Sequence, residues 1–83
     1  MLDVEAVMDQ LIVADPEILG GKPCVRGTRI SVELILELLA SGASREQILE
    51  RFPQVGERGY AAALGYAARA MRSEVVWDVS IPA

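Results

Sequence analysis

The sequence GGKPCVRGTRI at residues 20–30 leads directly into SVELILELLAS at residues 31–41. The first segment contains three of the eight basic residues of the chain and no acidic residue, and its three glycines and one proline are typical of a loop. The second segment starts with a serine, a favourable helix N-cap, and repeats apolar residues at helical spacing. The two segments therefore predict a basic loop that leads into a helix, an arrangement that presents positive charge to a polyanion or an acidic partner.

Length and composition predict a single small domain that spans residues 1–83. A chain of this length buries only about 60% of the surface that its unfolded form exposes. Even so, 52% of the residues are hydrophobic, whereas only 5% are aromatic. These proportions favour a compact helical domain with apolar surface left over, and we expect that surface to be used for association into a homodimer.

The reactive side chains of the chain argue against an enzyme. The chain has no histidine and a single cysteine, which excludes Ser–His and Cys–His catalysis, histidine ligation of zinc and an intrachain disulfide. Because Cys24 lies between Pro23 and Val25, we expect it to be buried as a small hydrophobic residue rather than to act as a nucleophile. We therefore predict no catalytic residue, no metal site and no cofactor.

The formal net charge of −4 is unevenly distributed. Residues 1–21 carry five acidic residues and no basic one, whereas residues 22–30 carry three basic residues and no acidic one. A negative total argues against strong non-specific DNA binding by a monomer, although a dimer can focus its basic residues on one face.

Two features bear on the cellular location. No apolar run approaches the roughly 18 residues of a membrane span. The first five residues, MLDVE, contain two acidic residues and no basic one, whereas a secretory signal starts with basic residues. We expect a cytoplasmic protein with no membrane partner.

Patterning along the chain predicts a mainly α fold, with three helices preceded by a short β-hairpin. The segments are a leader (1–9), a β-hairpin with the basic Gly-rich loop (10–30), a three-helix unit (31–72) and a tail (73–83). Strands are predicted at 10–14 and 24–26, where short β-branched or apolar runs end at turn residues.

The three helices are predicted at residues 31–41, 44–52 and 57–72. Ser31 is expected to cap the first helix, and Ser44 with Gln47 is expected to form a capping box at the start of the second.

The apolar residues predict which face of each helix is covered. In the first helix, Leu34 and Leu38 add a second apolar face, so this helix is either nearly buried or in contact with a partner. In the third helix, the face expected to point inward consists of Tyr60, Leu64, Ala67 and Met71.

A helix, a short turn, a short helix, a second turn and a longer helix follow each other in the order of a helix-turn-helix unit. In that motif the last helix enters the major groove of DNA, and its N-terminal side chains meet the base edges. Here these side chains are Glu57, Arg58 and Tyr60. The alternative is a three-helix bundle without a role in DNA binding.

The basic loop also has two interpretations. Lys22, Arg26 and Arg29 either contact the backbone of a nucleic acid or pair with acids of the same chain, such as Asp15 and Glu17.

The tail alternates apolar residues at Val75, Trp77, Val79 and Ile81. Trp77 either covers the core or anchors a partner, because tryptophan is favoured at interface hot spots. We predict that these four residues bind a partner protein.

Several segments of the chain together resemble the bacterial family known as domain of unknown function 433. They are DPEILGGKP at 15–23, VRGTRISV at 25–32, GAS at 42–44, FP at 52–53 and AALGYA at 62–67. The resemblance covers about residues 11–70. One departure is the turn before the third helix, which reads Val55-Gly56-Glu57 where the family often has Leu-Ser or Leu-Thr followed by acids.

The resemblance implies a homeodomain-like helix-turn-helix fold behind a short β-hairpin. It also implies the antitoxin of a type II toxin–antitoxin pair, of VapB type, whose toxin is a PIN-like ribonuclease. An acidic chain with an apolar tail suits a basic ribonuclease partner. We expect an autorepressor that contacts DNA through Lys22, Arg26, Arg29 and Arg58. The alternative is a protein-interaction module that does not bind DNA.

Overall fold

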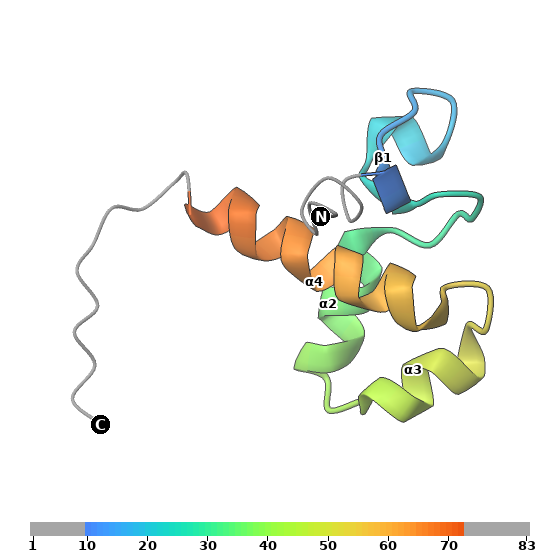
Figure 1. The fold of residues 1–83 in the computed structure, drawn as a ribbon, viewed down its shortest axis with the longest axis vertical. Coiled ribbons are helices and arrows are strands. Elements are labelled where there is room, and N and C mark those ends of the chain that lie inside the picture. The colour runs from blue at the N-terminus through green and yellow to red at the C-terminus, as the bar shows by residue number, and fades with distance from the viewer. Residues whose placement is uncertain (1–9, 73–83) are drawn as a thin grey trace, which may run out of the picture.

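The computed structural model describes residues 10–72, and the predicted leader (1–9) and tail (73–83) lie outside this described part (Figure 1). Its elements are β1 (Ile12–Val13), the 3₁₀ turn η1 (Leu19–Gly21), β2 (Cys24–Val25), α2 (Val32–Ala40), α3 (Arg45–Arg51) and α4 (Gly56–Arg72). Residues 10–72 are thus mainly helical, with three helices behind a short antiparallel hairpin, as the sequence predicted.

The hairpin is shorter than predicted. Ile12 lies opposite Val25 and Val13 opposite Cys24, so each strand has two residues. The first strand stops because the chain turns at Asp15, whose carboxylate accepts a hydrogen bond from the Glu17 backbone N at 2.9 Å. A two-stranded sheet of this size is not stable alone, so its stability comes from packing against the helices.

Local hydrogen bonds start α2 and α3 where the sequence predicted. The Ser31 hydroxyl accepts a hydrogen bond from the Leu34 backbone N at 2.9 Å. At the start of α3, Ser44 Oγ accepts from the Gln47 backbone N, and Gln47 Oε1 accepts from the Ser44 backbone N. The capping box is therefore confirmed.

The backbone conformation at the start of α4 explains why its first residue is a glycine. Gly56 has a φ of +68°, in the left-handed region that glycine adopts without a steric penalty. Serine or threonine would be a better helix cap, but either would be strained in this conformation.

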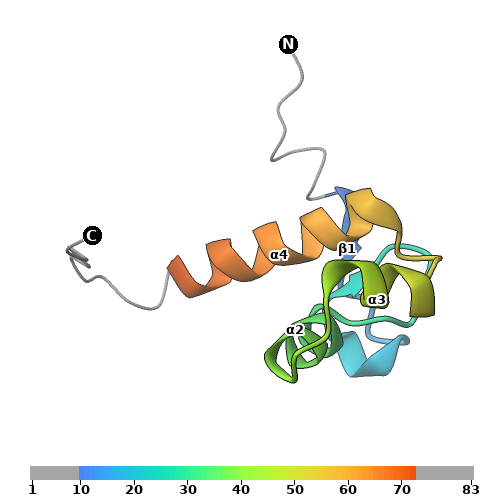
Figure 2. The ribbon, with the colours of Figure 1, turned by 90° about the horizontal axis from the view of Figure 1, so that it is seen from below.

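The core lies where the hairpin and the three helices meet. Figure 2 shows α4 passing over the hairpin and α2, and then extending past the other described elements. The buried apolar side chains come from both strands and all three helices, and the largest with less than 2% of their surface exposed are Ile35, Ile48 and Cys24.

The predicted inner face of α4 is partly wrong. Tyr60 is buried as expected, but the other buried residues of the helix are Gly59, Ala62 and Ala63, and Met71 is 59% exposed. The N-terminal half of α4 packs against both the hairpin and α2, which buries a wide sector of small residues. The C-terminal turns extend beyond those elements, so an apolar stripe that continues along the helix has less to pack against.

Candidate functional site

The turn that follows β2 presents two of the predicted DNA-contacting side chains, Arg26 and Arg29. The Thr28 backbone N donates to the Val25 carbonyl at 3.0 Å, and the Thr28 hydroxyl donates to the same oxygen at 2.8 Å. The hydroxyl also accepts from the Ile30 backbone N at 3.0 Å. Both arginines are exposed on this well-bonded turn.

Neither of these two arginines pairs with a carboxylate in the part of the chain that the structure describes. Arg26 Nε donates to the backbone carbonyl of Gln10, which orients the guanidinium without neutralising it. Arg29 forms no hydrogen bond or ion pair with any other residue in the range 10–72.

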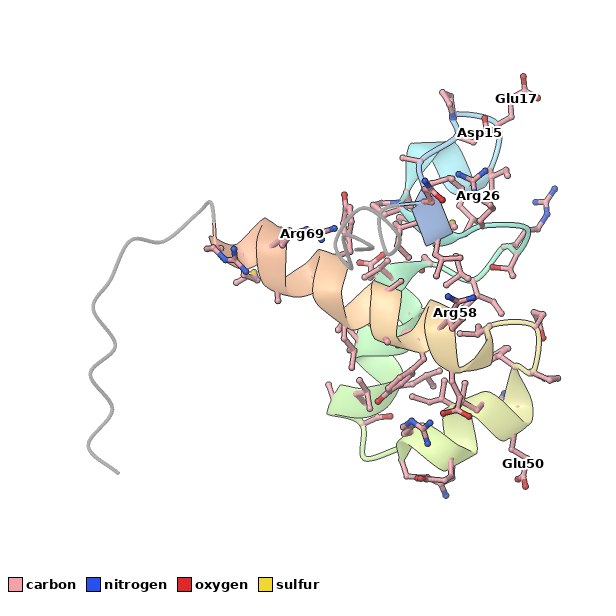
Figure 3. The ribbon with its side chains drawn as sticks, in the orientation of Figure 1. Asp15, Glu17, Arg26, Glu50, Arg58 and Arg69 are labelled. Atoms are coloured by element: carbon pink, nitrogen blue, oxygen red, sulfur yellow. The ribbon has the colours of Figure 1, made fainter. Side chains whose placement is uncertain are left out.

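Arg58 lies near the turn that carries Arg26, because the residues next to these two arginines are in contact in the core. A Cβ atom built on Gly59 would lie 2.9 Å from Val25 Cγ1, so the backbone of α4 touches β2 at this point. Arg58 precedes Gly59 and Arg26 follows Val25, and Figure 3 shows both arginines on the side where the hairpin meets the start of α4. We call Arg26, Arg29 and Arg58 the arginine face.

The other two side chains predicted to meet base edges, Glu57 and Tyr60, are engaged within the protein: one is in an ion pair and the other is buried. Arg45 of α3 forms an ion pair with Glu57, which ties the starts of the two helices together. Tyr60 is only 9% exposed, so the prediction that it faces DNA is wrong. Arg58 is therefore the exposed side chain at this helix start that is available to a base edge.

Lys22, the remaining predicted DNA contact, lies in an ion pair. Its Nζ is 2.6 Å from Glu33 Oε1 in the first turn of α2. The hydrogen bond with the Glu33 carboxylate, and its negative charge, raise the pKa of Lys22 above the ordinary value of 10.5. Pairing with an acid of the same chain is thus confirmed for Lys22, but the acid is Glu33 rather than Asp15 or Glu17.

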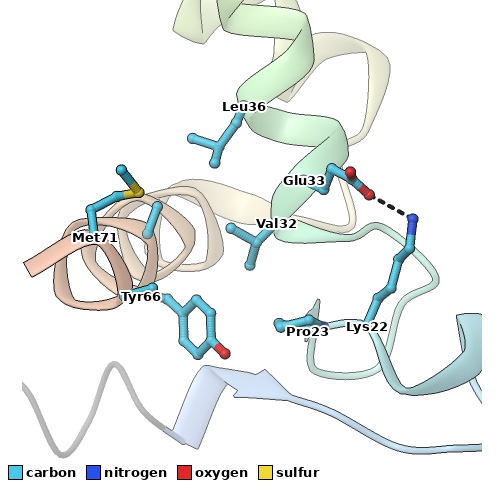
Figure 4. A pocket seen from close by; sticks show the side chains of 9 residues that line it. Lys22, Pro23, Val32, Glu33, Leu36, Tyr66 and Met71 are labelled. Carbon is cyan, nitrogen blue, oxygen red and sulfur yellow. Dashed lines mark hydrogen bonds and ion pairs between the residues drawn. The ribbon is translucent and has the colours of Figure 1, made fainter. Parts of the chain in front are cut away.

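An apolar groove lies between α2 and α4, with Lys22 and Glu33 at its rim (Figure 4). Its volume is about 330 Å³. Its apolar lining includes Val32 and Leu36 of α2 with Tyr66 and Met71 of α4. We call this the α2/α4 groove. Sequence analysis missed it because its walls come from segments more than 25 residues apart.

A second groove, of about 380 Å³, lies between α2 and α3. Leu34 and Leu38, the predicted second face of the first helix, line it together with Phe52 and Arg51. The Arg51 guanidinium lies 5.7 Å from the centre of the Phe52 ring. Each of the two apolar faces of α2 therefore borders a groove. Only Val32 and Ile35 of this helix are buried, so it is not nearly buried, and its contact with a partner stays a prediction.

Two further features of the range 10–72 bear on the predicted chemistry, namely the position of Cys24 and the grouping of side chains that bind metals. Cys24 has no exposed surface, and its thiol donates to the Lys22 carbonyl at 3.2 Å, in agreement with the predicted burial. No three side chains of the types that bind metals gather in this range. None of the helices in this range is both long and apolar enough to cross a membrane. The predicted partner-binding residues Val75, Trp77, Val79 and Ile81 lie outside the described residues.

Comparison with known proteins identifies relatives without a known activity. The model of a family described as protein of unknown function (DUF433) matches residues 12–67. The uncharacterized protein y4eO of Sinorhizobium fredii (strain NBRC 101917 / NGR234) is 41% identical over 54 residues, which cover 65% of this chain and 24% of the relative. The match thus spans about a quarter of the length of that relative. No solved structure matches the chain significantly.

Proposed function

The chain belongs to the DUF433 family of proteins of unknown function, and we propose that it is a non-enzymatic cytoplasmic antitoxin. In this proposal a homodimer with a homeodomain-like helix-turn-helix binds DNA as an autorepressor and binds a PIN-like toxin. The observation that supports DNA binding is the arginine face, in which Arg58 at the start of the last helix and two arginines of the turn after β2 are exposed and have no carboxylate partner within residues 10–72.

Each arginine has a role that fits its position. Arg58, in the first turn of α4, suits a bidentate contact with a guanine edge, as expected for the N-terminal part of a recognition helix. Arg26 and Arg29, on the neighbouring turn, suit phosphate contacts that set the register of the protein on the duplex. Lys22 stays a predicted phosphate contact, but we expect a smaller contribution because Glu33 already neutralises its charge.

The proposal includes a dimer because one copy offers few unpaired basic groups. Each chain has a net charge of −4, so binding depends on the local field of the arginine face, and two copies place two such faces on one duplex. With Arg26 and Arg29 of both copies on phosphates, the slope of log affinity against log salt concentration is about −4. If the two Lys22 side chains also contribute, the slope is about −5.

The toxin part of the proposal rests on the resemblance described above. The tail residues Val75, Trp77, Val79 and Ile81 supply an apolar segment that can order on the surface of the toxin. Co-expression of the full chain with a PIN-like ribonuclease from the neighbouring gene tests this part. A stable complex with reduced ribonuclease activity is expected, and an unchanged ribonuclease that purifies alone would contradict it.

A second candidate function is a protein-interaction module without DNA binding. The two apolar grooves on either side of α2 favour it, because exposed apolar surface of this kind marks interaction sites.

Filter binding with the DNA upstream of the chain's own gene separates the two candidates. The full chain is expected to bind this DNA at low salt, and Arg58→Ala is expected to weaken the complex. Arg72→Ala is the matched control, because it removes one exposed arginine from the other end of α4. If no complex forms at low salt, with or without the toxin, DNA binding is wrong and the interaction module takes its place.

A further inference from the structure

The α2/α4 groove is an apolar surface distinct from the arginine face. Leu36 and Met71 at its edges are 37% and 59% exposed, and both are among the most exposed large apolar side chains of the described residues. Tyr66 and Val32 also line the groove (Figure 4). Leaving such side chains in water forgoes about 25 cal/mol for each Å² of apolar area that could be covered.

The chain itself supplies a segment whose pattern fits this groove. After Arg72, apolar residues occupy alternate positions at Val75, Trp77, Val79 and Ile81, while the intervening positions are mostly polar. In an extended segment, alternate residues point to the same side, so these four residues form one apolar face. A segment with a single apolar face needs a single apolar surface to cover it, and the groove provides one.

We propose that the α2/α4 groove binds the C-terminal segment 75–81 of the same molecule, with Trp77 as the anchor. α4 ends at Arg72, the residue after Met71, which lines the groove, so the segment follows this wall of the groove in the sequence. Trp77 lies five positions after Arg72, a stretch that spans up to about 17 Å when extended. The part of α4 that borders the groove, from Tyr66 to Met71, rises only about 8 Å.

Trp77 can therefore reach back along α4 after a reversal of the chain at Ser73, a residue type that favours turns. A volume of about 330 Å³ is at the lower end of the range for small-ligand pockets and is sufficient for one indole ring. Trp77 also offers the largest apolar area in the segment. The groove and a toxin would then compete for the same segment, and the toxin would have to displace the segment from the groove in order to bind it.

Because Trp77 is the only tryptophan, its fluorescence in the isolated full chain tests the proposal without DNA or toxin. The emission is expected to be shifted to shorter wavelength than that of N-acetyltryptophanamide in water, with slower quenching by acrylamide. Leu36→Glu and Met71→Glu are each expected to move the emission to the wavelength of the free model compound. Leu19→Glu is the matched control, because Leu19 is 43% exposed and does not line the groove.

Circular dichroism of each variant shows whether the helices are intact. If Leu36→Glu does not fold, the fluorescence of Met71→Glu provides the test. Emission at the water value in the unaltered chain would overturn the proposal. A short-wavelength emission that neither groove variant changes would also overturn it, because Trp77 would then be buried elsewhere. A shift that disappears on dilution in step with dissociation of a dimer would assign the groove to a second copy and overturn binding within one molecule.

Discussion

The arginine face and the α2/α4 groove have opposite chemistry, although both are built from the loop 20–30 and α4. On the arginine face, Arg26, Arg29 and Arg58 have no carboxylate partner among the described residues. In the groove, Lys22 is paired with Glu33 and the surface between the helices is apolar. One basic segment of the sequence therefore contributes to two surfaces of different chemistry.

The strand β2 causes this division. Cys24 has no exposed surface and Val25 is 3% exposed, so this pair anchors the middle of the loop in the core. The loop also closes on itself, because the Val25 backbone N donates to Ile30 and the Val32 backbone N donates to Pro23. Lys22 and Pro23 are left on the groove side, and Arg26 and Arg29 on the other side. A cluster of charges in a sequence need not form a cluster in space when buried residues interrupt it.

The largest expected effect comes from a core substitution that destabilises the whole domain and with it both surfaces. Ile35 has no exposed surface in the core beneath them, so Ile35→Ala is expected to lower the free energy of unfolding by about 2–5 kcal/mol. This is a large fraction of the stability of a small domain. Urea denaturation followed by circular dichroism measures it.

Leu36→Ala is the matched control for this prediction, since Leu36 is the next residue in α2 and is 37% exposed. Its cost is expected to be about 1 kcal/mol or less. Equal costs for the two variants would mean that α2 buries a different face from the one described.

The second prediction compares how much a substitution on each surface lowers the affinity for DNA. Arg58→Ala is expected to cost about 1–3 kcal/mol of binding free energy on the preferred site and to relax base specificity, because it removes a base contact. Lys22→Ala is expected to change the affinity less than Arg26→Ala does, because Lys22 is already paired. Filter binding over a salt series measures both. A larger loss for Lys22→Ala would place the paired lysine on the DNA and contradict the division.

The third prediction concerns the contact that brings Arg26 and Arg58 together. Gly59→Ala would force a Cβ into Val25, a β-branched side chain with little room to move. Overpacking costs about 1–3 kcal/mol, and the higher helix propensity of alanine offsets about 1 kcal/mol. We expect a net loss of about 1 kcal/mol in a urea denaturation curve.

Ala68→Gly calibrates the propensity effect at an exposed position of the same helix, where the expected cost is about 0.5–1 kcal/mol. If Gly59→Ala instead stabilises the protein by a similar amount, the close approach of α4 to β2 is not as described.

The smallest expected effect is the change in stability when the ion pair at the groove is removed. Because Lys22 and Glu33 are both more than half exposed, Glu33→Gln is expected to leave the urea midpoint at pH 7 unchanged. The pKa of Lys22 is raised in the folded state, so any stabilisation is present below pH 10.5 and is lost as the pH rises through the folded value. An NMR titration of Lys22 is expected to show a lower pKa in the variant, and an unchanged pKa would contradict the pairing.

The sequence by itself determined the features whose causes lie within a few residues. The caps at Ser31 and Ser44 depend on side chains that bond backbone groups three residues away, so their spacing was sufficient to predict two helix starts. The burial of Cys24 and the order of hairpin and helices were predicted for similar reasons, from short apolar runs between turn residues. The exposed position of Arg58 at a helix start also follows from local pattern, while its contact with DNA stays a prediction.

Only the tertiary structure decided which distant segments meet. It paired Lys22 with Glu33, set Gly59 against Val25 and formed grooves on both sides of α2. It also changed the buried face of α4, because that face depends on what packs against each half of the helix. Local propensities are summed over neighbouring residues, whereas these contacts follow from burying the shared core, and no short pattern in the sequence encodes that geometry.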